Sequence, residues 1–239
     1  MTNKINLLNY KKECITKNKI RSFINRKKKL TKNQIYILNN IWEEIEINFN
    51  KKQCDLSKIF NNFNEVIMEI GFGIGTSLID MAIQNPKKNF LGIEVYKPGI
   101  ATCLMLIKEK NIKNLKIIRY DAIDILDFMI PNNSLSIIQL FFPDPWHKTK
   151  HNKRRIVQIS FIEKIYAKLI NNGVFHMATD WEPYAKHVIS IMKKVNYFIN
   201  LSKSGNYVPR PKTRPKTKFE IKGEKLGHNI YDLMFKKIQ

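Results

Sequence analysis

The feature that most constrains the fold is a regular alternation of apolar runs and helix-like stretches from residue 64 onward. The runs are rich in branched residues and end at glycines, acids or prolines, as strands buried in a parallel sheet do. The predicted strands span residues 65–73, 89–96, 115–122, 134–145, 173–180, 197–204 and 230–238. The predicted helices span residues 76–86, 97–112, 122–130, 154–170 and 182–195. Units of this length predict an α/β fold with a doubly wound, Rossmann-like sheet that binds ligands at the carboxyl ends of its strands.

The first 62 residues follow a different pattern and are predicted to form a separate element. Residues 1–30 are polar and basic without sustained periodicity, which indicates a flexible basic arm. Thr31 is a plausible N-cap for a helix from about Lys32 to Ile47, and residues 48–62 form a link rich in Asn and Lys. We therefore divide the chain into a basic arm with its helix, residues 1–62, and an α/β domain, residues 63–239.

The charge of the chain is strongly positive and unevenly distributed. Lys and Arg number 42 against 20 Asp and Glu, and 35 of the 42 are Lys. Coding bias toward A+T-rich codons alone could raise the lysine content, since the chain also has 37 Ile and 26 Asn. However, the net charge is +9 over residues 1–62, +1 over residues 63–150 and +12 over residues 151–239. A near-neutral centre with basic flanks favours polyanion binding around a site for a smaller ligand.

Cysteine usage and hydropathy exclude several classes of protein. The three cysteines, Cys14, Cys54 and Cys103, include no C-x-x-C pair, which argues against a disulfide scaffold or a cysteine zinc ribbon. The sequence has no apolar run of about 18 residues and no secretory signal pattern. These features predict reduced thiols, no membrane span and a cytoplasmic location.

The first predicted strand ends in a glycine-rich turn that begins with an acid. Glu69 is followed by Gly71, Gly73 and Gly75, a G-x-G-x-G spacing that differs from the G-x-G-x-x-G of pyrophosphate-binding turns. Glycines let the backbone approach a ligand closely, whereas the carboxylate would repel a diphosphate. A cationic ligand fits better, and S-adenosylmethionine, with its ammonium and sulfonium groups, is such a ligand.

Three further acids follow the ends of successive predicted strands. Glu94 lies 23 residues after Gly71, close to the spacing expected of an acid that accepts hydrogen bonds from ribose hydroxyls. Asp121 ends the third strand, where it could accept from an adenine amino group, and Asp144 ends the fourth. One such acid is ordinary turn chemistry. Four in a row favour a cofactor site.

The segment FFPDPWHKTKHNKRR, residues 141–155, is the most unusual in the chain. Two prolines fix the direction of Asp144, Trp146 offers a stacking face, and basic residues follow directly. Stacking and positive charge beside a rigid carboxylate are how enzymes hold a single base. His147 and His151 have i,i+4 spacing, but no third ligand accompanies them, so we predict no metal site. Asp180 ends the fifth strand beside an aromatic residue, either in the site or as a helix N-cap.

Several motifs together resemble those of one enzyme family. GFGIG, IEVYKPG, FFPDPWHKTKHNKRR, ATDWEPYA and RPKTKFEIKGEKLGHNIYDL occur in an order and spacing similar to those of the bacterial tRNA (guanine-N7)-methyltransferases, the TrmB family. The similarity runs from about Arg21 to the C-terminus. The glycine motif is common to class I methyltransferases, whereas the PDPWHKxKHxKRR and RPxTKFExxGxxLGH blocks are specific. The resemblance implies a seven-stranded class I methyltransferase sheet with helices on both faces and an antiparallel last strand.

The resemblance also implies an activity and a set of site residues. The implied reaction is methylation by S-adenosylmethionine of N7 of guanosine 46, in the variable loop of tRNA. The implied catalytic residue is Asp144. The implied cofactor-binding residues are Glu69, Gly71, Gly73, Gly75, Glu94, Asp121 and Asp144. The implied substrate-binding residues are Lys148, Asp180, Thr217, Lys218, Phe219 and Glu220. The implied RNA-binding residues are Arg26, Lys150, His151, Asn152, Lys153, Arg154 and Arg155.

Three other interpretations remain open at the level of sequence. The first is a methyltransferase for an exocyclic base amine, since PDPW is similar to the D-P-P-W motif of that chemistry. The second is a nicotinamide dehydrogenase, which Glu69 and the glycine spacing disfavour. The third is a non-catalytic RNA-binding subunit with the same fold, which the acids at four strand ends argue against. The oligomeric state, monomer or homodimer, also remains open.

Overall fold

The computed structural model describes residues 20–24, 29–40 and 45–238. Secondary structure in these residues follows the alternation expected from the sequence. The helices are α1 Lys32–Asn40, α3 Leu56–Phe60, α4 Thr76–Gln84, α5 Lys97–Glu109, α6 Ala122–Phe128, the 3-10 helix η2 Thr149–Arg154, α7 Ile159–Lys168, α8 Glu182–Met192 and α9 Lys218–Lys225. The strands are β1 Val66–Ile70, β2 Asn89–Ile93, β3 Leu115–Ile118, β4 Leu135–Phe141, β5 Leu169–Thr179, β6 Phe198–Asn200 and β7 Tyr231–Lys237.

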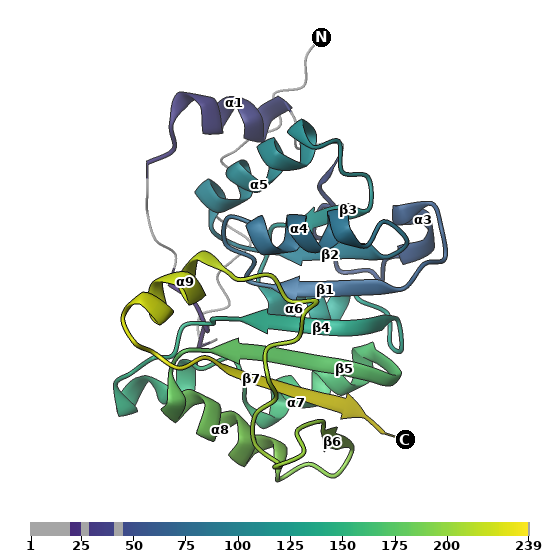
Figure 1. Cartoon of the computed structure of the whole chain (residues 1–239). Helices are drawn as coiled ribbons and strands as arrows, with labels where there is room; N and C mark the ends of the chain where they lie inside the picture. The colour runs from purple at the N-terminus through teal and green to yellow at the C-terminus, as the bar shows by residue number, and fades with distance from the viewer. Residues whose placement is uncertain (1–19, 25–28, 41–44, 239) are drawn as a thin grey trace.

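The strands form one seven-stranded sheet in the order β3-β2-β1-β4-β5-β7-β6 (Figure 1). β1 pairs in parallel with β2 and β4, and the outer pairs β2–β3 and β4–β5 are parallel too. β7 lies antiparallel between β5 and β6, which confirms the antiparallel last strand. The strand order reverses between β1 and β4. In a doubly wound sheet a crevice opens at this reversal, outside the carboxyl ends of the strands.

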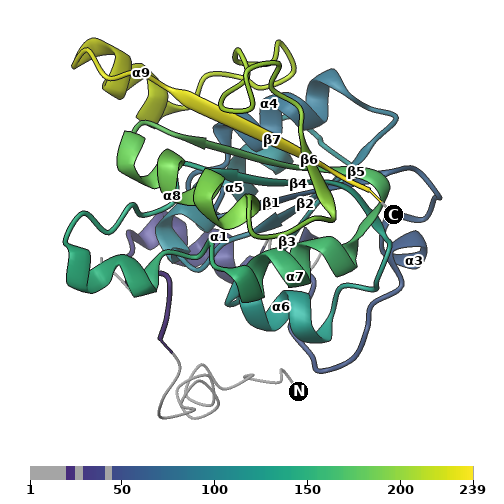
Figure 2. The same ribbon diagram turned by 90° about the horizontal axis from the view of Figure 1, so that it is seen from below.

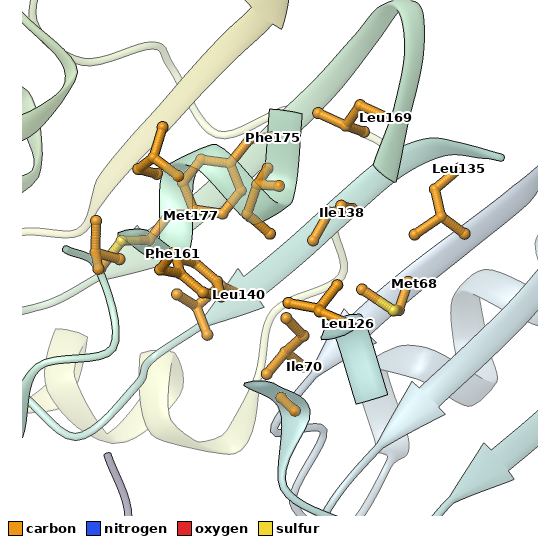
Figure 3. Packing of buried hydrophobic residues seen from close by; sticks show 14 of the residues in the cluster. Met68, Ile70, Leu126, Leu135, Ile138, Leu140, Phe161, Leu169, Phe175 and Met177 are labelled. Atoms are coloured by element: carbon orange, nitrogen blue, oxygen red, sulfur yellow. The ribbon is translucent and has the colours of Figure 1, made fainter. Parts of the chain in front are cut away.

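Helices cover both faces of the sheet, and each face has its own apolar core (Figure 2). Side chains alternate between the two cores along each strand, as the period of two requires. In β1, Ile67 packs with α4 and α5, whereas Met68 and Ile70 pack with α6, α7 and α8. Figure 3 shows this second core, in which Leu126 and Phe161 lie against the side chains of the central strands. In the described residues, no helix is both long and apolar enough to cross a membrane.

The described part of residues 29–62 packs against the α/β domain, with α1 against α5 and with Leu56 and Phe60 of α3 in one of the two apolar cores. The capping role predicted for Thr31 is confirmed, because the Thr31 hydroxyl accepts from the Gln34 amide at 3.2 Å. The predicted continuation of this helix to Ile47 is wrong. Glu46 already forms a parallel bridge with Ile117 of β3, so the chain is extended there. The predicted link also contains α3, because Asp55 accepts hydrogen bonds from two amides of its first turn.

Two further predicted boundaries are wrong for local reasons. The helix predicted over residues 154–170 begins only at Ile159. Its first part is the end of η2 followed by an extended turn at Arg155. The helix ends at Lys168, and the Asn-Asn-Gly sequence of residues 171–173, which favours a helix end, lies within β5, whose pairing with β4 is irregular there. The segment between β6 and β7, for which no helix was predicted, contains α9.

Candidate active site

A cavity of about 520 Å³ opens where the strand order reverses, at the carboxyl ends of β1 and β4. It is large enough for a small-molecule ligand. Three of the four strand-end acids predicted to bind a cofactor line it: Glu69, Glu94 and Asp144. The other lining residues are Ser22, Phe23, Ile24, Ile70, Gly71, Phe72, Gly73, Ile74, Thr76, Ser77, Ile93, Val95, Tyr96, Tyr120, Ala122, Leu140, Phe141, Phe142, Pro143, Ile156, Thr217 and Phe219.

Glu69 presents a buried carboxyl group to the cavity from the end of β1. The residue is 3% exposed, and its Oε2 has no hydrogen-bond partner among the described residues. Burial, reinforced by the neighbouring charge of Glu94, raises the pKa of Glu69 to about 8. An unpartnered buried carboxyl next to an open cavity is a site where a cationic ligand would be stabilised.

Glu94 organises the glycine-rich turn. Its Oε2 accepts from the Gly73 amide at 2.8 Å, and its Oε1 accepts from the amides of Val95 and Tyr96 at 2.6 and 2.9 Å. Burial raises the pKa of Glu94, although these three hydrogen bonds oppose the shift. A carboxylate oxygen can accept two hydrogen bonds, so one acceptor position on Oε2 remains for a ligand.

The three glycines of the turn serve two different purposes. Gly71 and Gly73 line the cavity at φ of 77° and 63°, and a Cβ on either would meet open space. Gly75 does not line the cavity. It caps α4 at φ of 79°, and a Cβ there would lie 2.3 Å from Sγ of Cys103.

Asp121 does not line the cavity, although both of its neighbours in the sequence do. It is 8% exposed and accepts from the Ile123 amide at 3.0 Å as the N-cap of α6. Its neighbours Tyr120 and Ala122 line the cavity in its place. The Tyr120 ring stacks on Phe49 with centroids 3.7 Å apart, so this wall is aromatic and packed from behind.

Asp144 lies in a strained loop after β4. Phe142 and Trp146 both adopt the left-handed region, at φ of 50° and 47°. Each such conformation in a residue other than glycine costs on the order of 1–3 kcal/mol, so other contacts must hold the loop. The Phe142 amide donates to the Ala178 carbonyl at 2.8 Å, and the Trp146 indole donates to the Ser22 carbonyl at 3.1 Å.

The residues predicted to bind substrate divide between the cavity and its surroundings. Thr217 and the 68% exposed Phe219 line the cavity. Lys218 is the first residue of α9, which lies at the carboxyl edge of the sheet in Figure 1. Asp180 and Lys148 lie outside the cavity lining, with Lys148 exposed and Asp180 half-buried 3.6 Å from Nδ1 of His228.

Glu220 faces the protein interior. It is 1% exposed and forms a capping box with Thr217 at the start of α9. Its carboxylate accepts two hydrogen bonds from Arg214, at 2.5 and 3.0 Å. Arg214 also binds both carboxylate oxygens of Asp232 in β7 at 2.8 Å. This buried network fixes the start of α9 beside the cavity.

The segment predicted to bind RNA lies next to the Asp144 loop. Lys150, Lys153 and Arg154 are exposed, and His151 and Asn152 are half-buried. Arg155 is 5% exposed and does not join this surface. Arg26 lies outside the described residues. The His147 ring packs edge-on against the Trp181 ring, with their centroids 4.4 Å apart. This contact connects the basic segment to the turn that follows β5. In the described part of the chain, no group of three or more His, Cys, Asp or Glu residues could hold a metal ion.

Sequence reasoning missed the apolar side of the cavity and the network behind α9. Tyr96, Tyr120 and Phe142 give no sequence signal that distinguishes them from core residues. The capping box was detectable, because Thr217 and Glu220 have the T-x-x-E spacing that typically opens a helix. Nothing in the local sequence of Arg214 indicates its partner Asp232, which lies 18 residues away.

Comparisons with known proteins agree with this architecture. A family model described as a putative methyltransferase matches residues 63–233. The chain is 51% identical over 221 residues to the tRNA (guanine-N(7)-)-methyltransferase of Photorhabdus laumondii, and the aligned region covers 92% of this chain and 92% of that one. It is 50% identical over 221 residues to the enzyme of the same name from Salmonella typhimurium, again over 92% of each. The solved structure of the 16S rRNA methyltransferase KamB matches with a TM-score of 0.55 at 11% identity, and covers 79% of this chain and 95% of that one.

The sheet order and the carboxylate-lined cavity define a class I methyltransferase. The likeness to KamB supports that fold alone. The identity to the curated relatives goes further. The chain belongs to the tRNA (guanine-N(7)-)-methyltransferase family, which confirms the resemblance seen in its motifs.

Proposed function

We propose that this protein transfers the methyl group of S-adenosylmethionine to N7 of guanosine 46 in the variable loop of tRNA, in the cytoplasm. The observation that carries the proposal is the gathering of Glu69, Glu94 and Asp144 around one cavity in a chain of this family. Three carboxyl groups in a mostly apolar cavity favour a cationic ligand over an anionic one.

The residues present fit S-adenosylmethionine. Glu69 offers an unpartnered buried oxygen, and Gly71 and Gly73 leave open space at the backbone. Glu94 keeps one acceptor position beside them. When bound, S-adenosylmethionine supplies a methyl group activated by its sulfonium. Glu69 would stabilise the positive charge of the donor, and Glu94 would hold the glycine-rich turn against it.

Asp144 acts on the guanine base. N7 of guanine carries an in-plane lone pair and no proton, so the chain needs no general base before attack. The acceleration therefore comes from orientation and from stabilising the positive charge that develops on the ring. The Asp144 carboxylate lines the cavity beside Phe142, which allows it to position the base and to oppose that charge.

The exposed cations beside Asp144 suit an RNA ligand. Lys148, Lys150, Lys153 and Arg154 follow the loop directly and are all exposed. N7 faces the deep, narrow major groove of A-form RNA, which side chains do not reach. A guanosine in a loop is therefore the accessible target.

The test is incubation of the protein with tritiated S-adenosylmethionine and unmodified tRNA, followed by digestion and identification of the labelled nucleoside. We expect N7-methylguanosine, and no label in a matched tRNA with adenosine at position 46. Labelled N6-methyladenosine would instead establish the exocyclic-amine activity. Absence of any transfer would favour a non-catalytic RNA-binding role.

Replacement of Asp144 tests the electrostatic role directly. Asp144→Asn should lower turnover at saturating substrates by about 100-fold, the usual effect of losing one such stabilising group. Asp80→Asn, which removes an exposed carboxylate on α4, is the matched control. Near-normal turnover of Asp144→Asn would show that its charge does not stabilise the reacting base.

A further inference from the structure

Two consecutive arginines next to the Asp144 loop have opposite environments. Arg154 is exposed, and its guanidinium lies over the Trp146 ring at 4.9 Å. Arg155 is 5% exposed and turns into the protein. Charge alone therefore does not describe their roles, because only Arg154 can meet a phosphate at the surface.

The Arg155 side chain is held between two parts of the molecule. Its Nε donates to the Pro145 carbonyl at 2.9 Å, and its guanidinium lies over the Tyr184 ring of α8 at 5.0 Å. Tyr184 is fixed in turn, because it is buried and its hydroxyl accepts from the Val157 amide at 3.4 Å. Arg155 thus connects the packed body of α8 to the loop after β4.

The backbone of Arg155 is fixed as well. Its amide donates to the Asn152 carbonyl at 3.0 Å, and its carbonyl accepts from the Gln158 side chain at 3.2 Å. The guanidinium therefore projects from a defined point toward Pro145. Because the backbone and the guanidinium of Arg155 are both already held, the side chain loses little conformational entropy when it donates to the Pro145 carbonyl. The contact is therefore well suited to fixing the position of the loop.

The Pro145 carbonyl directly follows Asp144, in the loop between β4 and η2. Pro143 and Pro145 have no amide hydrogen to donate. Phe142 and Trp146, on either side, both have positive φ. The Arg155 bond is thus a tertiary contact at the residue that follows the catalytic carboxylate.

We propose that Arg155 is a positioning residue, whose buried guanidinium holds the Pro145 carbonyl and thereby fixes Asp144 at the cavity, while the adjacent Arg154 binds the RNA. The inference rests on the proposed methyl transfer and deepens it. It replaces the RNA-binding role that the sequence motif implied for Arg155.

The experiment compares Arg155→Met, Arg155→Lys and Arg154→Ala with the wild type. Two quantities are measured: the single-turnover rate of N7-methylguanosine formation at saturating protein, and the Kd for tRNA as a function of salt. Methionine keeps an unbranched chain against Tyr184 but removes the donor, and lysine keeps the charge but not the planar guanidinium. Assays are run at temperatures where circular dichroism shows each variant folded.

We expect Arg155→Met and Arg155→Lys to lower the single-turnover rate at least tenfold, with the Kd for tRNA within twofold of wild type and an unchanged salt slope. Arg154→Ala should weaken tRNA binding and reduce the salt slope by about one, as loss of a phosphate contact does. The inference is overturned if Arg155→Met weakens tRNA binding at an unchanged rate, or if Arg155→Lys restores the rate. A wild type that forms no N7-methylguanosine would instead reject the proposed function.

Discussion

Binding of S-adenosylmethionine at pH 7 should release about one proton from Glu69. Burial and the neighbouring Glu94 raise the pKa of this carboxyl to about 8 in the free protein. At pH 7 it is therefore about nine-tenths protonated. A cationic ligand beside Oε2 favours the ionised form, so binding should lower the pKa and expel the proton.

The size of this effect follows from the pKa. One pKa unit corresponds to about 1.4 kcal/mol, which is the cost of ionising Glu69 at pH 7 before the ligand can pair with it. Affinity for S-adenosylmethionine should therefore rise about tenfold between pH 6 and pH 7. Glu69→Gln cannot ionise, and loss of the charged contact should weaken binding by on the order of 10- to 150-fold.

Isothermal titration calorimetry in buffers of different ionisation enthalpy measures the proton directly. The slope of observed enthalpy against buffer enthalpy gives the number of protons released, about one for the wild type and close to none for Glu69→Gln. Equal slopes for the two proteins would refute the reasoning, because the proton would then come from another group.

The same carboxyl should influence stability in the absence of ligand. Its pKa in the folded protein lies above the ordinary value of 4.5, so the folded state binds more protons than the unfolded state between these two pH values. The contribution of Glu69 to the free energy of unfolding therefore falls as pH rises from about 4.5 to about 8. Urea denaturation should show a flatter pH dependence for Glu69→Gln than for wild type.

Two substitutions test the packing around the site. Glu220→Ala leaves the buried Arg214 with one partner fewer and should cost about 3–5 kcal/mol in urea denaturation. Glu224→Ala, which breaks an exposed pair, should cost less than about 1 kcal/mol. If the two substitutions lowered the free energy of unfolding equally, the buried network would contribute no more to stability than an exposed ion pair. Gly75→Ala places a Cβ on a residue of positive φ and makes it overlap the buried thiol of Cys103. The substitution should lower the free energy of unfolding by about 2–4 kcal/mol. A loss below about 1 kcal/mol would mean that the turn rearranges freely.

The sheet and three of the four strand-end acids were predictable because parallel strands must be apolar and must end at one edge. That logic locates Glu69, Glu94 and Asp144 without any knowledge of tertiary contacts. It fails for Asp121, whose carboxylate caps α6 while the adjacent Tyr120 forms the wall. Strand-end position specifies the edge of the sheet, but which side chain faces the cavity depends on the backbone beyond the strand.

The orientation of arginines was not predictable, and the tandem RPKT repeat shows why. Arg210 and Arg214 occupy equivalent positions in two identical tetrapeptides. Arg214 is 1% exposed, whereas the Arg210 side chain is 39% exposed. The difference comes from Asp232, a partner in a distant strand. Arg154 and Arg155 differ in the same way, because the irregular segment they occupy has no periodicity from which facing could be inferred.

The position of β7 in the sheet sets an order of events during synthesis. Among the described strands, β6 is hydrogen-bonded to the sheet through β7 alone, and Arg214 needs Asp232 of β7 to complete its partners. During translation, β6 and α9 are therefore synthesised before β7, the strand that holds them in place. Strands β1 to β5 can pair while the chain is still growing, but the wall contributed by Thr217 and Phe219 waits for β7. An incomplete nascent chain thus has the strand-end carboxyl groups of the cavity without the wall that Thr217 and Phe219 complete.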